Sequence, residues 1–341
     1  MRRLRVLVLA HPAFIPPDSL EGLSEQERYD YKTEFDVMTT LRANGHEVKA
    51  LGVQEDLSPI RDAVENWRPD IVFNLLEEFQ GETLYAQNVA GFLELLRMPY
   101  TGCSPRGLML ARGKDISKKL VKYHRMPVPA FAVFPIGERI RKPASLQYPL
   151  FVKSVSEDAS LGISQASVVE SDEKLRERVS FVHQKCATPA IAEQYIEGRE
   201  IYVGVMGNSN PHVLPVWELD LSKLGAGKRP IATAHVKHNT DYQERRAVLH
   251  GRADDLPPAV EKQVRNYAKR IYKALELDGY ARVDFRLTPE GVPYFIEANP
   301  NPEIASTEEF ANAAEFEGMS YGKLLDRLMQ LGLERAGSDL A

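Results

Sequence analysis

The sequence contains little cysteine, no long hydrophobic run and no excess of basic residues. Only Cys103 and Cys186 occur among 341 residues, with no Cys or His at metal-binding spacing nearby, so we expect reduced thiols and a cytoplasmic protein. Because no apolar run approaches the ~20 residues of a membrane-spanning helix, no membrane partner is expected. A net charge of -5 at pH 7 argues against nucleic acid as a partner, because a basic excess would be needed to displace counterions from phosphates.

The length and composition are those of a globular protein with more than one core. Hydrophobic residues make up 43% and charged residues 27%, and 341 residues exceed what one ordinary core organises, which predicts two or three domains. Near the start, a basic flank precedes an apolar stretch at residues 6–10. That stretch is too short for a signal peptide, so we expect a buried parallel strand there.

Strands and helices alternate over the first hundred residues. Apolar periodicity predicts a strand, a helix, two further strands and a helix at residues 6–10, 32–44, 46–53, 70–76 and 83–97. This alternation predicts an open, mostly parallel α/β domain. The proline-rich loop from His11 to Pro17, with the acidic residues 19–30 behind it, is either a functional loop or a disordered surface loop.

Residues 282–302 have the pattern of a β-hairpin with its turn at Glu290 and Gly291. Counting outward from that turn places Asp284 opposite Glu297 and Arg282 opposite Asn299, all on one face of the sheet. The alternate residues are expected to point into the core: Val283, Phe285, Leu287, Tyr294 and Ile296.

Two directly opposed carboxylates repel each other, which indicates a cation between Asp284 and Glu297. With the side-chain oxygen of Asn299 they form a set that suits Mg²⁺ completed by water and phosphate oxygens. Arg282 could stabilise the anionic oxygens of a reacting phosphoryl or acyl group. A solvated polar face neutralised by Arg282 and Arg286 is the alternative.

Other segments carry lysines and small residues. A basic helix starts at Lys114, and a strand ends in Lys153. The loop at residues 154–164 could cover phosphates with its backbone N–H groups and hydroxyls, or be an ordinary hairpin loop. Further strands are expected within residues 191–206 and 213–219, and helices at 259–275 and 321–330.

Seven motifs follow one another in a fixed order, from about Asp70 to about Met329. They are Phe73-Asn74 with Gly81-Glu82, residues 99–102, Lys114 before residues 127–129, residues 151–153, residues 193–200, residues 282–285, and residues 297–299. In this order they resemble the ATP-grasp superfamily, and within it the D-alanyl-D-alanine ligase branch. The resemblance implies an ATP-grasp fold of α/β and α+β architecture with an N-terminal open parallel α/β domain. Domains are expected at about 1–113, 114–200 and 201–341.

The resemblance also implies roles for individual residues. ATP would lie between the central and C-terminal domains, with Lys114 and Lys153 at its phosphates and adenine and residues 156–162 as a lid. The expected ATP-binding residues are Lys114, Lys153, Ser160, Gly162, Glu193, Gln194, Tyr195, Ile196 and Glu200. Asp284, Glu297 and Asn299 would hold two Mg²⁺ ions, or Mn²⁺, with Arg282 and Lys237 as catalytic residues. A homodimer is common in the resembled family.

Departures from the family pattern concern the substrates. His11 lies where the family has a Gly-rich segment with a Glu, Glu77 stands where a His is usual, and Glu308 and Glu309 stand where Ser and Leu grip a substrate carboxylate. An acidic pair favours a cationic or uncharged acceptor. Glu308 and Glu309 could instead be the exposed first turn of a helix, with Ser306 or Thr307 as its cap.

We therefore expect an ATP-dependent ligase that joins a small-molecule carboxylate to an amine through an acyl phosphate, with a substrate other than D-alanine plus D-alanine. A true D-alanine–D-alanine ligase is the main alternative. An ATP-binding partner protein without ligase activity, and an ATP-grasp kinase or carboxylase, are further alternatives.

Overall fold

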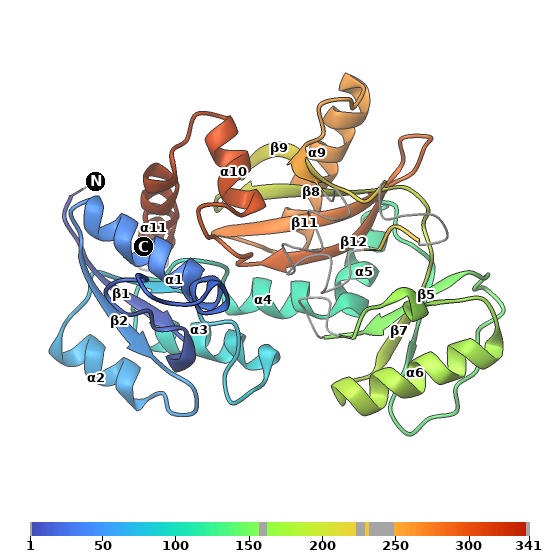
Figure 1. The fold of residues 1–341 in the computed structure, drawn as a ribbon, viewed down its shortest axis with the longest axis horizontal. Helices are drawn as coiled ribbons and strands as arrows, with labels where there is room; N and C mark the ends of the chain where they lie inside the picture. Colours follow the sequence, from blue (N-terminus) through green and yellow to red (C-terminus); the bar gives the residue numbers. More distant parts are fainter. Residues whose placement is uncertain (1, 157–161, 223–228, 232–248, 339–341) are drawn as a thin grey trace.

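The computed structural model describes residues 2–156, 162–222, 229–231 and 249–338, and its strands form three sheets (Figure 1). The first sheet is parallel, in the order β2-β1-β3, with β1 at Arg5–Ala10, β2 at Glu47–Gly52 and β3 at Ile71–Asn74. Helices α1 (Glu25–Ala43), α2 (Ser58–Asn66) and α3 (Ala86–Leu95) accompany it, with short 3-10 helices at Pro12–Phe14 and Thr83–Tyr85. The predicted parallel α/β domain is confirmed.

Helix α1 begins seven residues before the predicted start at Lys32, within the acidic stretch that was interpreted as a loop. Its N-terminus is a capping box: the hydroxyl of Ser24 accepts a hydrogen bond from the Glu27 N–H, and the Glu27 carboxylate accepts one from the Ser24 N–H. These hydrogen bonds satisfy backbone N–H groups that have no partner within the first turn of a helix. The carboxylate of Glu27 thereby stabilises the start of the helix within the acidic segment.

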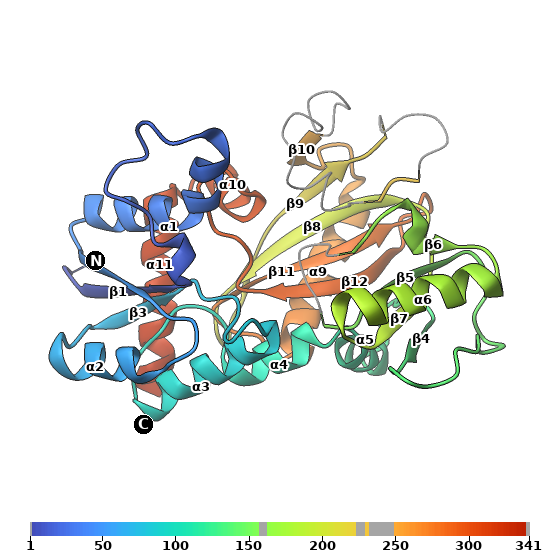
Figure 2. The ribbon, with the colours of Figure 1, turned by 60° about the horizontal axis from the view of Figure 1, so that its bottom comes forward.

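The second sheet is antiparallel, in the order β4-β7-β5-β6. Its strands are β4 (Phe131–Phe134), β5 (Leu150–Ser154), β6 (Val168–Val169) and β7 (Ala190–Gln194), and a 3-10 helix at Gln165–Ser167 precedes β6. Helix α6 (Asp172–Cys186) packs on this sheet (Figure 2). Leu150, Val152, Val179 and Val182 belong to a core that residues of this unit build alone.

The third sheet is antiparallel, in the order β10-β9-β8-β11-β12. Its strands are β8 (Arg199–Met206), β9 (His212–Asp220), β10 (Leu249–Arg252), β11 (Tyr280–Leu287) and β12 (Pro293–Pro300). Helix α9 (Pro258–Ala274) packs on β8, β9 and β11, and α10 (Glu309–Phe316) packs on β8 and β9. Helices α4 (Pro105–Arg112) and α5 (Lys114–Tyr123) pack against β12.

The hairpin pairs Asp284 with Glu297 and Arg282 with Asn299, as predicted, but it reaches this register by a different route. Leu287 pairs with Pro293 instead of Tyr294, so the predicted turn is wrong by one residue. A β-bulge between Asp284 and Phe285 restores the register. Because the bulge reverses the alternation on β12, the predicted core positions Tyr294 and Ile296 are only partly buried, and Phe295 is fully buried instead.

The first and third sheets share their hydrophobic cores. One core joins Leu7 and Val72 to Val203 and Phe285, and a second joins residues of β1 and β3 to α10 and the C-terminal helix α11 (Tyr321–Ser338). Helix α11 packs on α1 and β3, and α5 packs on β12 and α9 (Figures 1 and 2). The division at residues 113 and 200 stays a prediction. Within the described residues, no helix is long and apolar enough to cross a membrane.

Candidate active site

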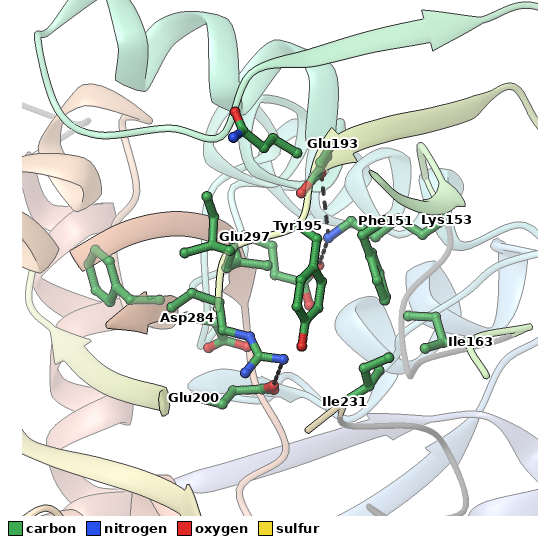
Figure 3. Close-up of a pocket in the computed structure, with 14 residues that line it drawn as sticks. Phe151, Lys153, Ile163, Glu193, Tyr195, Glu200, Ile231, Asp284 and Glu297 are labelled. Carbon is green, nitrogen blue, oxygen red and sulfur yellow. Dashed lines mark hydrogen bonds and ion pairs between the residues drawn. The ribbon is translucent and has the colours of Figure 1, made fainter. Parts of the chain in front are cut away.

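A pocket lies between the second and third sheets (Figure 3). It holds about 650 Å³ of space between protein atoms, part of it open to solvent, which is within the usual range of small-molecule sites. Apolar, polar and charged side chains line it: Phe151, Lys153, Ile163, Glu193, Gln194, Tyr195, Ile196, Glu200, Ile231, Asp284, Phe285, Arg286, Ile296 and Glu297. The pocket thus brings together eight of the predicted ATP-binding and metal-binding residues.

Buried lysines and glutamates form an ion-pair network at one end of the pocket. The ammonium group of Lys153 lies 3.7 Å from the Glu193 carboxylate and 3.3 Å from that of Glu297 (Figure 3). The ammonium group of Lys114 lies 3.8 Å from the Glu297 carboxylate. Burial disfavours the charge of Lys153, but Glu193 and Glu297 outweigh it and raise the pKa of Lys153 above its ordinary value. Two fixed ammonium groups at one site suit the phosphates of a nucleotide.

Lys118 belongs to the same network and was missed by the sequence analysis. Its side chain is fully buried, donates to the backbone oxygens of Ile296 at 2.6 Å and Phe295 at 3.3 Å, and lies 3.3 Å from the Glu193 carboxylate. Burial lowers the pKa of Lys118 to about 8 although Glu193 opposes the shift. Its spacing of four residues from Lys114, on the same face of α5, was the available signal.

Arg282, Asp284 and Asn299 lie together on the face of the hairpin that the register predicted. The Arg282 guanidinium donates two hydrogen bonds to the Asp284 carboxylate, at 2.8 and 2.9 Å, and the Asn299 amide donates one at 2.9 Å. Asp284 raises the pKa of Arg282 despite burial, so the guanidinium stays charged. Arg282 also stacks on Tyr202, with 4.6 Å between the guanidinium carbon and the ring centroid.

The oxygen donors at this place fit Mg²⁺. Asp284 and Glu297 are paired across neighbouring strands, and the ion pairs of Asp284 with Arg282 and of Glu297 with Lys153 offset the repulsion between the two carboxylates. Among the described residues, no group of three or more His, Cys, Asp and Glu side chains is arranged to hold a metal ion. A Mg²⁺ ion here therefore needs Asn299 or nucleotide phosphates to complete its shell, which is the usual coordination in nucleotide enzymes.

The segment from Glu193 to Ile196 forms the wall of the pocket at the end of β7. The N–H groups of Gln194 and Tyr195 donate to the backbone oxygens of Ala130 and Pro149, at 2.8 and 3.0 Å. Glu200 accepts a hydrogen bond from the Tyr202 hydroxyl at 2.7 Å and lies 3.6 Å from Arg286 (Figure 3). The Glu200 carboxylate is thereby held at the rim, where it can accept hydrogen bonds from a ligand's hydroxyl groups.

The predicted lid and one predicted catalytic residue cannot be placed. Ser160 and Lys237 lie outside the described residues. Gly162 is described, and its backbone oxygen accepts a hydrogen bond from Arg178.

Two of the predicted substrate-binding residues, His11 and Glu77, lie at the carboxyl edge of the parallel sheet. The His11 side chain follows β1 and accepts a hydrogen bond from the Ala13 N–H at 3.2 Å. Glu77 follows β3, and its backbone oxygen accepts from Arg112 at 3.1 Å. Ligands of open α/β sheets bind outside the carboxyl ends of the strands, so this edge is a suitable place for a substrate.

Helix α10 starts at Glu309, but neither Glu308 nor Glu309 is exposed. Glu308 lies 2.7 Å from the Lys32 ammonium, and Glu309 lies 3.2 Å from His250 and 3.6 Å from Arg282. Burial opposes the charge of Glu309, but His250 and Arg282 lower the pKa of this carboxyl. The predicted start of the helix is confirmed. The prediction that its first turn is exposed was wrong, because both carboxylates form ion pairs.

The expected cap by Ser306 or Thr307 is also wrong. Glu308 occupies the cap position without a side-chain cap bond, and the Ser306 hydroxyl instead donates to Asp36 of α1 at 2.7 Å.

The sequence model of the family described as "D-ala D-ala ligase C-terminus" matches residues 120–330, more than half of the chain. The chain belongs to the D-alanine–D-alanine ligase family. It is 33% identical over 258 residues to the D-alanine–D-alanine ligase of Bordetella petrii, covering 75% of this chain and 73% of that protein. It is 32% identical over 269 residues to the uncharacterized protein y4sG of Sinorhizobium fredii, covering 78% and 75%.

A solved structure of the family has the same fold. The D-alanine–D-alanine ligase from Bacillus anthracis complexed with ATP superposes with a TM-score of 0.73, at 22% identity, over 98% of this chain and 99% of that chain. The predicted ATP-grasp fold is therefore confirmed. As a member of this family, the protein is an ATP-dependent ligase that forms carbon–nitrogen bonds, which favours a ligase over a silent ATP-binding partner, a kinase or a carboxylase.

Proposed function

We propose that the protein joins a small-molecule carboxylate to an amine through an acyl phosphate, with a substrate pair other than D-alanine plus D-alanine. The observation that carries the proposal is the acidic segment directly after β12, where Glu303, Glu308 and Glu309 follow one another within seven residues. A carboxylate at the end of an incoming substrate would be repelled by the negative charge that Lys32, His250 and Arg282 leave unbalanced there, whereas a cationic or uncharged group would not.

The chemistry starts from a carboxylate, which is a poor electrophile until one of its oxygens attacks the terminal phosphorus of ATP. That step forms the acyl phosphate and releases ADP; a neutral amine then attacks the acyl carbon, and phosphate leaves as the amide forms. Lys114 and Lys153 bind the nucleotide phosphates, and Glu200 binds its ribose hydroxyls. Arg282 faces the negative charge that develops on the transferring phosphoryl group and then on the tetrahedral intermediate.

Asp284, Glu297 and Asn299 would hold two Mg²⁺ ions, which would supply positive charge beside the phosphates. Glu193 keeps Lys118 and Lys153 in position from the buried side of the pocket. Glu309 holds Arg282 from the side opposite Asp284, so the guanidinium is oriented before substrates arrive.

The test is an ADP-release screen with ATP and Mg²⁺ against pairs drawn from D- and L-amino acids, small acids and amines. We expect strong turnover with a pair other than two D-alanines, and loss of that turnover in Asp284→Asn. The matched control is Asp254→Asn, an exposed aspartate after β10. Efficient turnover with D-alanine alone would refute the substrate proposal.

D-alanine–D-alanine ligation is the second candidate, because relatives such as the Bordetella petrii protein carry that name. For that reaction a substrate carboxylate must bind beside the acidic segment. The positive charge of Lys32, which lies 2.7 Å from Glu308, would then have to outweigh the negative charge of the glutamates.

A further inference from the structure

Residues 229–231 belong to the connection between β9 and β10 of the third sheet, but they contact the second sheet. The side-chain amide of Gln165, in the 3-10 helix before β6, accepts a hydrogen bond from the Arg229 N–H and donates one to the Arg229 backbone oxygen, both at 3.0 Å. One amide thus satisfies both backbone groups of Arg229, as a neighbouring strand would. We call these two hydrogen bonds the Gln165–Arg229 pair.

The Arg229 side chain also contacts residues that follow strands of the second sheet. Its guanidinium carbon lies 5.2 Å from the centroid of the Tyr195 ring, and the same group forms an ion pair with Glu170, directly after β6. The Glu170 side chain is 68% exposed, so this ion pair contributes little. The Gln165–Arg229 pair and the ring contact with Tyr195 therefore hold residues 229–231 to the second sheet.

A buried arginine holds the same residues from the third sheet. Arg286 of β11 is 8% exposed, and it donates hydrogen bonds to the backbone oxygen of Pro230 and, at 2.8 Å, to that of Gly198. Gly198 lies between β7 and β8, where the chain passes from the second sheet to the third. Residues 229–231 are thus fixed to both of the sheets that enclose the candidate nucleotide pocket.

Ile231 is the residue of this segment that lines the pocket. It is 2% exposed, and Ile163 and Tyr195 line the same pocket (Figure 3). Ile163 lies just before Gln165 in the sequence and Ile231 just after Arg229, so the Gln165–Arg229 pair joins two apolar walls that come from different sheets. Apolar side chains suit the base of a nucleotide, whereas lysines suit its phosphates.

We propose that Gln165 and Arg229 are positioning residues for the nucleotide: they hold Ile231 against its base and thereby slow the release of ADP. A base that lies between these walls leaves when the walls separate. The hydrogen bonds of Gln165 and the ring contact of Arg229 must then break, so their free energy adds to the barrier for release. The inference rests on the proposed nucleotide site, but it is independent of which carboxylate and which amine react.

The test measures ADP binding to the immobilised full chain by surface plasmon resonance in the presence of Mg²⁺. We expect ADP to dissociate ~tenfold faster from Gln165→Ala, as the loss of its hydrogen bonds implies. Arg229→Ala keeps the backbone groups that pair with Gln165 but loses the contact with Tyr195, so we expect a smaller increase, ~threefold. Because Gln165 is exposed, its replacement should leave the temperature of thermal unfolding unchanged.

The matched control is Gln184→Ala, which replaces an exposed glutamine on α6 and should leave ADP dissociation unchanged. Tripolyphosphate, which has no base, separates positioning of the base from a general loss of structure. It should dissociate at the same rate from the unchanged protein and from Gln165→Ala, because Lys114 and Lys153 are untouched. Equal acceleration for ADP and tripolyphosphate would overturn the inference, as would unchanged ADP dissociation from Gln165→Ala.

A double variant tests whether the pair acts through Ile231. Ile231→Ala should itself speed ADP release, and adding Gln165→Ala to it should change the rate little further, because the wall that the pair holds is already gone. Two independent, additive effects would contradict the proposed role of the pair.

Turnover separates the inference from the proposed function. If ADP leaves Gln165→Ala faster but no substrate pair drives ADP formation from ATP, the positioning role stands and the ligase proposal fails. If a pair other than two D-alanines turns over and ADP leaves Gln165→Ala and the unchanged protein at the same rate, the ligase proposal stands and the positioning role fails.

Discussion

Glu34 should make the free protein less stable as the pH rises, and Glu34→Gln should remove this effect. The carboxyl group has an ordinary pKa of 4.5 and a pKa of about 8 in the folded protein, because burial opposes its charge. Between these values the folded state binds more protons than the unfolded state, so stability falls as pH rises through this interval. At ~1.4 kcal/mol for each pH unit, the loss reaches ~5 kcal/mol at most.

The assay is urea unfolding at pH 5, 7 and 9 without ATP or substrates. We expect similar stability of both proteins at pH 5 and a progressively larger advantage of Glu34→Gln at pH 7 and 9. Glu303 titrates in the same range and interacts with Glu34, so the comparison is repeated with Glu303→Gln present in both proteins. The exposed Glu315→Gln should show no pH-dependent difference. A Glu34→Gln protein that is less stable than the unchanged protein at pH 9 would refute the reasoning, because it would show that the carboxylate has a stabilising partner.

Three further outcomes are expected. Lys118→Met should lower the free energy of unfolding by ~3 kcal/mol in urea titrations, because it leaves the buried Glu193 carboxylate without its nearest cation; a change below ~0.5 kcal/mol would contradict the network. Asp284→Ala should reduce ADP release at least ~1,000-fold with the far-ultraviolet circular dichroism unchanged, and unaltered turnover would remove the metal-site proposal. Glu309→Gln should be less stable than the unchanged protein at pH 7, and this difference should disappear as pH falls below 4.5 through the lowered pKa of Glu309; a constant difference down to pH 2 would contradict the ion pairs with His250 and Arg282.

The sequence pattern predicted correctly which side chains share one face of the hairpin, because side chains along a strand alternate between faces every residue. Arg282, Asp284 and Asn299 lie together as the register requires. The turn itself was wrong by one residue, and the bulge between Asp284 and Phe285 compensated for the error. A bulge depends on packing against neighbouring strands, so the hairpin sequence alone does not specify it.

Contacts between distant segments could not be predicted in the same way. Lys118 was within reach of a spacing argument, since it lies one helical turn after Lys114. Glu34 and Glu303 are far apart in the sequence and become neighbours only when α1 packs against the segment after β12. The acidic residues before Lys32 resembled a loop by composition, and the capping box that makes them a helix depends on two side chains in fixed positions.

The first and third sheets share hydrophobic cores, and this packing indicates which parts of the molecule can move relative to each other. Helix α11 returns the end of the described chain to the first sheet, so residues from both halves of the sequence share two hydrophobic cores. The second sheet has its own core, and it is joined to the rest of the molecule by the chain before β4 and after β7 and by the ion pairs of Lys153 with Glu297 and of Glu193 with Lys118. This division predicts that nucleotide entry and ADP release move the second sheet relative to the first and third sheets, while the carboxylates at the edge of the first sheet and Arg282 move together.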